Sequence, residues 1–211
     1  LLTVNQAWQP YMEVLPRKYR FRIINGSMSR FIQLCLADQN GNRVPFQFIA
    51  NDGNFVVRPI TLNRLDEQGT AERYDIVVDF SRFAVGDKIT LVNLLKQISG
   101  NKPDGVLSVA QALAQFQSPD PLGDPAVGPV MQFRVVDEVE SVDVDGHTHR
   151  AGDPDLSRVP SVLTEQIPIV APVRERHVEF GRSGTGDSRD PVTGECNPDC
   201  PEEMPFPWTV K

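Results

Sequence analysis

The segment from Ala71 to Phe80 constrains the fold of this chain more than any other feature. Four apolar residues occupy every second position within it: Tyr74, Ile76, Val78 and Phe80. The positions between them include Asp75 and Asp79. Side chains along a strand alternate between two faces, so this period-two pattern is typical of a strand with one buried and one solvated face. Residues 18–24 repeat the pattern and run into a turn signal, Asn25-Gly26-Ser27.

Strand-like segments separated by turn residues recur along residues 1–138. They cover residues 2–5, 11–14, 18–24, 31–36, 46–50, 55–57, 60–62, 71–80, 89–93 and 130–136. Asn40-Gly41-Asn42 is the turn signal that closes one predicted hairpin. The pieces 55–57 and 60–62 flank Pro59, which places them at a sheet edge. Short strands that recur in this way predict an all-β sandwich.

Residues 94–129 interrupt this strand pattern. Several apolar residues inside this range follow helical spacing: Val106, Val109, Ala110, Leu113 and Phe116. Asp104 is predicted to cap that helix. We interpret the range as an insertion between the last two strands of the sandwich. It is either surface decoration or a wall beside a substrate, because long ordered insertions are often functional.

The character of the chain changes after residue 138. Residues 139–172 are acidic and contain prolines, and we interpret them as an interdomain linker. Residues 173–211 contain two further strand-like segments, 177–181 and 207–211. Two strands do not form a domain alone. The predicted domains are therefore 1–138, the linker 139–172, and the incomplete start of another domain at 173–211.

The overall composition excludes some classes of partner. The 211 residues carry a formal charge of -7, whereas binding to a phosphate backbone needs a basic face. No apolar run approaches the roughly 18 residues that a membrane span requires, and no signal-peptide pattern is present. The chain starts at Leu1 rather than Met. We interpret it as a processed or cleaved product.

The three cysteines lie in two different contexts. Cys35 lies in a strand-like segment, and we interpret it as a small apolar filler. Cys196 and Cys200 form Cys-Asn-Pro-Asp-Cys in a segment rich in turn residues. A local disulfide is the leading interpretation, and it would imply an oxidising compartment. A zinc half-site is the alternative, although no second Cys or His pair follows it.

Five segments together resemble a known family. Residues 16–27, Pro-Arg-Lys-Tyr-Arg-Phe-Arg-Ile-Ile-Asn-Gly-Ser, resemble the opening of the middle domain of bacterial multicopper oxidases. That group includes spore-coat laccase, bilirubin oxidase, phenoxazinone synthase and manganese oxidases. Residues 48–53, 71–75, 131–135 and 2–14 resemble further segments of the same domain, so the resemblance covers residues 1–138 in order. Residues 177–211 are similar to the first two strands of the third cupredoxin domain.

The resemblance implies a cupredoxin-like Greek-key β-sandwich and a laccase-like oxidase. Such enzymes take single electrons from a phenolic, organic or metal-ion reductant at a blue (type 1) copper. They pass the electrons to a trinuclear copper cluster that reduces dioxygen to water. In the family, the copper ligands come from the first and third domains, which would be the partners of this chain. The implied location is extracellular, periplasmic, or on the spore or cell surface.

The histidines do not match a copper site. A blue-copper site needs two His and one Cys thiolate, and this chain has three His in total. The first His after Cys35 is His147, and none follows Cys196 or Cys200. We therefore predict no catalytic, cofactor-binding or metal-binding residue in this chain.

Other polar groups are given structural interpretations. His147 and His149 are interpreted as solvated loop histidines, with weak binding of a divalent cation by the surrounding acidic residues as the alternative. Residues 183–188 are a flexible hairpin loop, because no Lys follows at phosphate-loop spacing. A second group is predicted to form ion pairs, to fix turns or to lie on an interdomain surface: Glu72, Arg73, Asp75, His177 and Glu179.

Two functional hypotheses follow. The first is the central part of a multicopper oxidase that is active only with its copper-binding domains. The alternative is a non-catalytic β-sandwich that serves as a binding or interaction module. Exposed apolar side chains distinguish the two, because an oxidase part should leave its partner-facing side uncovered. The residues expected there are Trp8, Phe180, Phe206 and Trp208.

Overall fold

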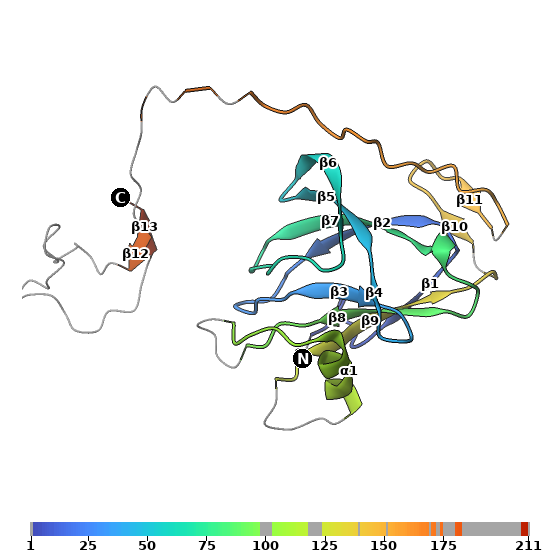
Figure 1. Ribbon diagram of the computed structural model, residues 1–211, viewed down its shortest axis with the longest axis horizontal. Coiled ribbons are helices and arrows are strands. Elements are labelled where there is room, and N and C mark those ends of the chain that lie inside the picture. Colours follow the sequence, from blue (N-terminus) through green and yellow to red (C-terminus); the bar gives the residue numbers. More distant parts are fainter. Residues whose placement is uncertain are drawn as a thin grey trace, which may run out of the picture. The chain divides into compact units, whose positions relative to one another are not determined.

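The structure, a computed structural model, describes residues 2–97, 103–117, 124–138, 140–150, 152–168, 170–171, 174, 180–182 and 208–210. The chain divides into two compact units, Leu1–Gln166 and Ile167–Lys211. The first unit is a β-sandwich of two facing sheets (Figure 1). The predicted all-β class is therefore confirmed, whereas the predicted domain limits stay a prediction.

One sheet of the sandwich has five strands, in the order β1-β9-β8-β3-β4. The strands are β1 Tyr11–Val14, β9 Gly128–Val135, β8 Lys88–Asn93, β3 Leu34–Ala37 and β4 Arg43–Val44. β1 pairs with β9 in parallel, with Tyr11 opposite Gln132, and the remaining pairs are antiparallel. β8 and β9 are the two strands between which the insertion was predicted.

The other sheet has four antiparallel strands, in the order β2-β7-β5-β6. The strands are β2 Lys18–Ile24, β7 Arg73–Asp79, β5 Phe46–Asn51 and β6 Asn54–Leu62. A short 3-10 helix, η1 (Phe80–Arg82), follows β7. The two predicted pieces around Pro59 form the single strand β6. It lies at the sheet edge, where a missing N–H can face away from the ladder.

The core lies between the two sheets. The period-two residues of β2 and β7 face it, and they meet aromatic side chains of the other sheet. The Phe21 ring lies 4.9 Å from that of Phe133, and the Phe80 ring lies 5.3 Å from it. Phe80 and Ile76 are buried. Burial of these apolar side chains is what holds the two sheets together.

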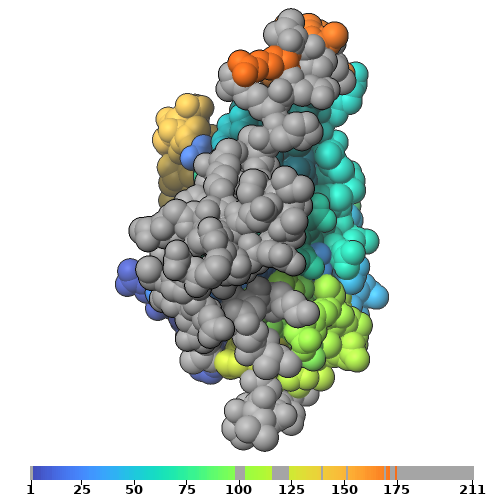
Figure 2. All heavy atoms as spheres, turned by 90° about the vertical axis from the view of Figure 1, so that its left-hand side faces the viewer, coloured from blue at the N-terminus to red at the C-terminus, as the bar shows by residue number. Residues whose placement is uncertain are grey.

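A helix, α1 (Val109–Gln117), covers the outer face of the five-stranded sheet. Val109 and Ala112 pack there with Val92 and Cys35. Gly128, at the start of β9, has a φ of +112°, and a Cβ on it would lie 3.0 Å from the Ala112 carbonyl oxygen. Glycine thus permits the close approach of helix and strand. In the space-filling view, the insertion (green) and the β5–β6 residues (teal) lie toward opposite ends of one face (Figure 2).

The predicted cap of this helix is wrong. Ser108 rather than Asp104 precedes the first turn. The Gln111 backbone N–H donates to Ser108 Oγ, and the Ser108 backbone N–H donates to Gln111 Oε1. This reciprocal pair is a capping box, in which a side chain three residues into the helix satisfies the cap residue. Asp104 instead pairs with Lys96 at 3.6 Å.

The N-terminal strand predicted at residues 2–5 is also wrong. Val4 and Ala7 exchange two backbone hydrogen bonds of 2.9 Å and close a tight turn. Asn5 and Gln6 within it adopt positive φ values of 48° and 70°, which a strand does not allow. The strand predicted at 31–36 begins only at Leu34, because Ile32 pairs outside the sheet with Gln68.

The acidic linker contains regular structure within the first unit. Two short antiparallel strands, β10 (Ser141–Val142) and β11 (Thr148–His149), form a hairpin. Further on, Asp155 accepts hydrogen bonds from the Lys18 backbone N–H at 2.9 Å and from Lys18 Nζ at 3.1 Å. The Leu163 N–H donates to the Val57 carbonyl of β6 at 2.9 Å. The linker is therefore tied to both edge strands of the four-stranded sheet.

In the second unit, β12 (Phe180–Arg182) pairs antiparallel with β13 (Trp208–Val210). The strands predicted at 177–181 and 207–211 thus correspond to a pair. Several predictions lie outside the described residues: those on Glu179, His177, Cys196, Cys200, Phe206 and the loop 183–188. No described helix is long and apolar enough to cross a membrane.

Candidate functional site

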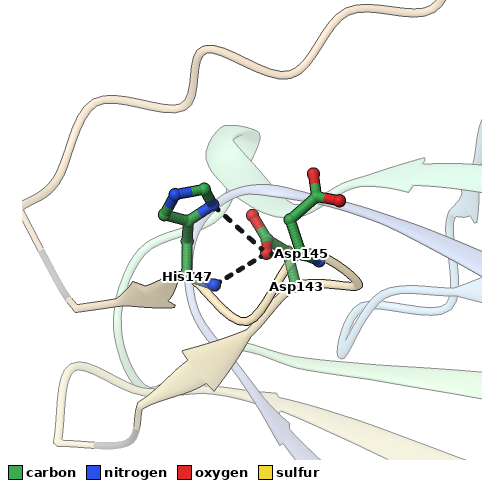
Figure 3. Close-up of side chains that lie close together, drawn as sticks. All are labelled: Asp143, Asp145 and His147. Carbon is green, nitrogen blue, oxygen red and sulfur yellow. Dashed lines mark hydrogen bonds and ion pairs between the residues drawn. The ribbon is translucent and has the colours of Figure 1, made fainter.

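Within the part of the chain that the structure describes, the β10–β11 hairpin brings together three side chains of the kinds that bind metals: Asp143, Asp145 and His147. Asp143 Oδ1 accepts backbone N–H groups from Asp145 at 3.0 Å and from His147 at 2.9 Å. Asp143 Oδ2 lies 3.0 Å from His149 Nε2. Gly146 takes the positive φ of 83° that the turn requires. Figure 3 shows the Asp143, Asp145 and His147 side chains on one side of the turn.

Hydrogen bonds to Asp143 favour its ionised form. They lower the pKa of this carboxyl to about 2, chiefly through His149 and next through the His147 backbone N–H. His147 Nδ1 lies 3.6 Å from Asp143 Oδ1. The interpretation of solvated loop histidines holds for His147, whose side chain is 76% exposed. His149 is only 24% exposed, and its Nε2 lies 3.0 Å from Asp143 Oδ2.

This hairpin offers limited capacity for a metal ion. Ligand atoms of Asp143, Asp145 and His147 lie within 4.8 Å of one another. Both oxygens of Asp143 already serve the turn and the His149 ring. The contacts of this carboxylate are therefore those of a turn-forming residue, and they account for the hairpin without an ion.

The polar residues of the β7 region have structural contacts. Glu72 Oε2 accepts the backbone N–H of Gly69 and closes the turn before β7. Arg73 lies 3.4 Å from Asp52, and Asp75 pairs with Arg20 across the outer face of the sheet. These are the ion pairs and the turn contact that were predicted from the sequence.

A buried ion pair that sequence patterns did not reveal joins two distant segments. Arg30 donates two hydrogen bonds to Asp124, of 2.7 and 2.6 Å, and others to the carbonyls of Phe31, Leu95 and Gln97. Burial acts to raise the pKa of Asp124, but the bonds from Arg30 and from two backbone N–H groups outweigh it and lower that pKa. Only the three-dimensional fold brings together residues so far apart in sequence, so no local signal could have found them.

Cys35 has the environment of a structural thiol. It is fully buried beneath α1, and its packing partners there are aliphatic. Burial raises the pKa of the thiol to about 11. A protonated, enclosed thiol is inert, which agrees with its interpretation as an apolar filler.

Comparison with known proteins places this fold in a family. The chain is 33% identical to a bilirubin oxidase of Albifimbria verrucaria over 183 residues, which are 85% of this chain and 26% of that protein. It is 30% identical to a multicopper oxidase of Oryza sativa subsp. japonica, over 100% of this chain and 31% of that protein. No family model matches the chain.

A solved structure agrees with these two relatives. The McoA multicopper oxidase from Aquifex aeolicus matches with a TM-score of 0.53 and 26% identity, over 82% of this chain and 30% of the other. The chain belongs to the multicopper oxidase family. It spans about a quarter to a third of the length of these relatives. The resemblance found in the sequence is thereby confirmed.

The described residues of this multicopper oxidase chain do not fit a blue-copper site. Such a site takes two imidazoles and one thiolate. The Cys35 thiol is enclosed by aliphatic side chains, whereas His147 and His149 lie on the β10–β11 hairpin and contact Asp143. No step of a copper reaction can therefore be assigned to the described residues.

Proposed function

We propose that this chain is the central, non-copper-binding part of a multicopper oxidase. The whole enzyme would couple one-electron oxidation of a reducing substrate to reduction of dioxygen to water. One observation carries the proposal: nearly the whole chain matches a part of named oxidases, while no histidine follows closely after any of its three cysteines in the sequence. Type 1 copper and a trinuclear cluster would then be held by residues outside this chain.

The role of the chain in this proposal is architectural. Its sandwich would hold the flanking copper-binding domains apart and contribute surface beside the electron donor, which is a phenolic or other organic molecule or a metal ion. The ion pair of Arg30 with Asp124 would keep the insertion 94–129 in a defined position. The location proposed for the protein is extracellular, periplasmic, or on the cell or spore surface; a disulfide between Cys196 and Cys200, which the sequence predicts, would require such an oxidising compartment.

The test compares residues 1–211 with a longer polypeptide that includes the flanking sequence. Copper would be measured by mass spectrometry, and oxygen uptake would be followed with 2,6-dimethoxyphenol as the electron donor. We expect copper and oxygen uptake in the longer polypeptide, and no stoichiometric copper in residues 1–211. The double variant His147→Ala and His149→Ala serves as the control, since it should leave oxygen uptake unchanged. One bound copper ion per isolated chain of 211 residues would refute the proposal.

A further inference from the structure

The sandwich contains a large apolar cavity that its function so far leaves unexplained. The cavity has a volume of about 640 Å³ and opens to solvent between the two sheets, beside β1, β2 and the N-terminal residues Leu2 to Gln6. Both sheets contribute to its walls, including Phe21, Ile23, Ile76, Val130 and Phe133. Packed protein interiors have few voids larger than a water molecule. A hollow of this size that opens between two sheets leaves room for the apolar side chains of a further segment.

The strand β2 beside this cavity has a free edge. Among the described strands it pairs with β7 alone. Just past its end, Asn25 exchanges backbone hydrogen bonds with Glu72 and Ala71, on the β7 side. Backbone groups of an antiparallel strand alternate in direction from one residue to the next. The N–H and C=O groups of Arg20, Arg22 and Ile24 therefore point away from β7.

An independent contact confirms this direction. Lys18 precedes Arg20 by two residues, so its backbone N–H also points away from β7. It donates a hydrogen bond to Asp155 of the linker at 2.9 Å. The linker thus closes the first position of the edge and leaves Arg20 to Ile24 open. Ile24, which also lines the cavity, is 63% exposed. Free backbone groups beside an uncovered apolar hollow are the features that receive an added strand.

We propose that an extended segment of the same protein, outside residues 1–211, pairs with β2 along Arg20–Ile24 and fills the cavity with its apolar side chains. Every second side chain of such a strand would point between the sheets. This inference rests on the proposed function, because the relatives extend well beyond the part that this chain matches, which is 26% and 31% of their lengths.

A second copy of the chain fits the same edge less well. Lys18, Arg20 and Arg22 form the outward series of β2. Pairing two β2 strands would bring Arg20 and Arg22 close to the same cations of the other copy, and these two arginines share the single carboxylate of Asp75. Like charges directly opposite each other on paired strands are destabilising. The partner strand is therefore expected to carry neutral or acidic residues on its solvent face.

Amide hydrogen exchange tests the proposal. The Arg20, Arg22 and Ile24 amides would be followed in residues 1–211 and in the longer polypeptide. We expect their exchange to slow at least about a hundredfold in the longer polypeptide, because pairing protects them. Fast exchange in both polypeptides would overturn the proposal. Protection in residues 1–211 that grows with protein concentration would do the same, because it would identify a second copy as the partner.

A pair of variants isolates the backbone contribution. Arg22→Pro removes the outward N–H, whereas Arg22→Ala removes only the side chain. In the longer polypeptide we expect Arg22→Pro to cut the protection of Arg20 and Ile24 at least about tenfold, and Arg22→Ala to retain it. Comparing both variants in residues 1–211 corrects for any strain that proline introduces. Equal protection in the two variants of the longer polypeptide would contradict strand pairing.

The outcome is separable from that of the proposed function. Copper content and oxygen uptake are measured on the same longer polypeptide as the exchange rates. Protection of the β2 edge in a polypeptide without copper would support the added strand and refute the proposed oxidase function. Copper and oxygen uptake with an unprotected edge would support the oxidase and refute the strand. A small apolar molecule retained in native mass spectra beside an unprotected edge would also refute it.

Discussion

Arg30 shows at the residue scale how one side chain can organise two distant loops. Its guanidinium bonds three backbone carbonyls and both oxygens of Asp124, and the two side chains are only 16% and 5% exposed. Arginine suits this position because its planar fork binds a carboxylate at two points while its other N–H groups reach carbonyls. A lysine could supply only a point charge there.

The first prediction concerns this ion pair. Arg30→Ala leaves the Asp124 carboxylate buried and without its partner, so unfolding should become easier by about 3 kcal/mol. Urea denaturation followed by tryptophan fluorescence measures this difference. Arg82→Ala is the matched control, because Arg82 is exposed at the end of η1 and should change stability by less than about 0.5 kcal/mol. Equal effects of the two substitutions would show that the buried pair contributes nothing.

The second prediction concerns Asp143. Its pKa of about 2 lies below the ordinary value of about 3.9, so its bonds to the hairpin are fully present above pH 4 and are lost as the pH falls toward 2. His149→Ala removes the main cause and should raise this pKa toward the ordinary value. NMR titration of the carboxyl carbon measures the change. The control Val144→Ala, in the same exposed turn, should leave the pKa of Asp143 unchanged. An unchanged pKa in His149→Ala would show that His149 is not the main cause of the low value.

At the scale of elements, sequence patterns predicted what is local. Strands β2 and β7 follow from strict alternation, and α1 follows from helical spacing. The helix cap was missed because Ser108 and Asp104 are both good cap residues, and only the position of the first turn separates them. The parallel pairing of β1 with β9 was not predictable, because a period-two pattern states that a residue is in a strand but not which strand lies beside it.

The third prediction concerns the linker as an element. Asp155 is its anchor: one oxygen binds Lys18 and the other binds Ser157. Asp155→Ala should release this segment and speed tryptic cleavage after the exposed Arg158 several-fold, because proteases cut locally opened segments. Gel analysis of a limited digest measures the rate. Glu165 is an exposed acidic residue of the same linker, and the control variant Glu165→Ala should be cleaved at the same rate as the unaltered protein. The same unchanged rate in Asp155→Ala would show that Asp155 does not anchor the linker.

At the scale of the whole molecule, the described strands of each unit pair only within that unit. The fourth prediction follows from this separation. Removing residues 167–211 should change the unfolding free energy of the sandwich by less than about 0.5 kcal/mol, so its urea midpoint should stay nearly the same. Circular dichroism of the two chains in urea measures it. A loss of about 2 kcal/mol or more would show that the second unit supports the first.

The candidate site was predictable only in part. The order of the three histidines and three cysteines in the sequence led to the prediction that no blue-copper set forms in this chain, and this stays a prediction. The bond between His149 and Asp143 was missed, although the Asp-Gly pair at 145–146 signals a tight turn that would bring both ends of the hairpin together. Arg30 with Asp124, and the cavity beside β2, depend on the final packing of both sheets and have no local signature.

The parallel pairing of β1 with β9 has a consequence for synthesis on the ribosome. Tyr11 and Met12 are made more than a hundred residues before their partners Gln132 and Phe133. At roughly 5 to 20 residues per second, the nascent β1 waits about 6 to 24 seconds for the strand that completes its backbone pairing. Chaperones that bind nascent chains therefore have a defined time window, between the synthesis of β1 and that of its partner strand β9.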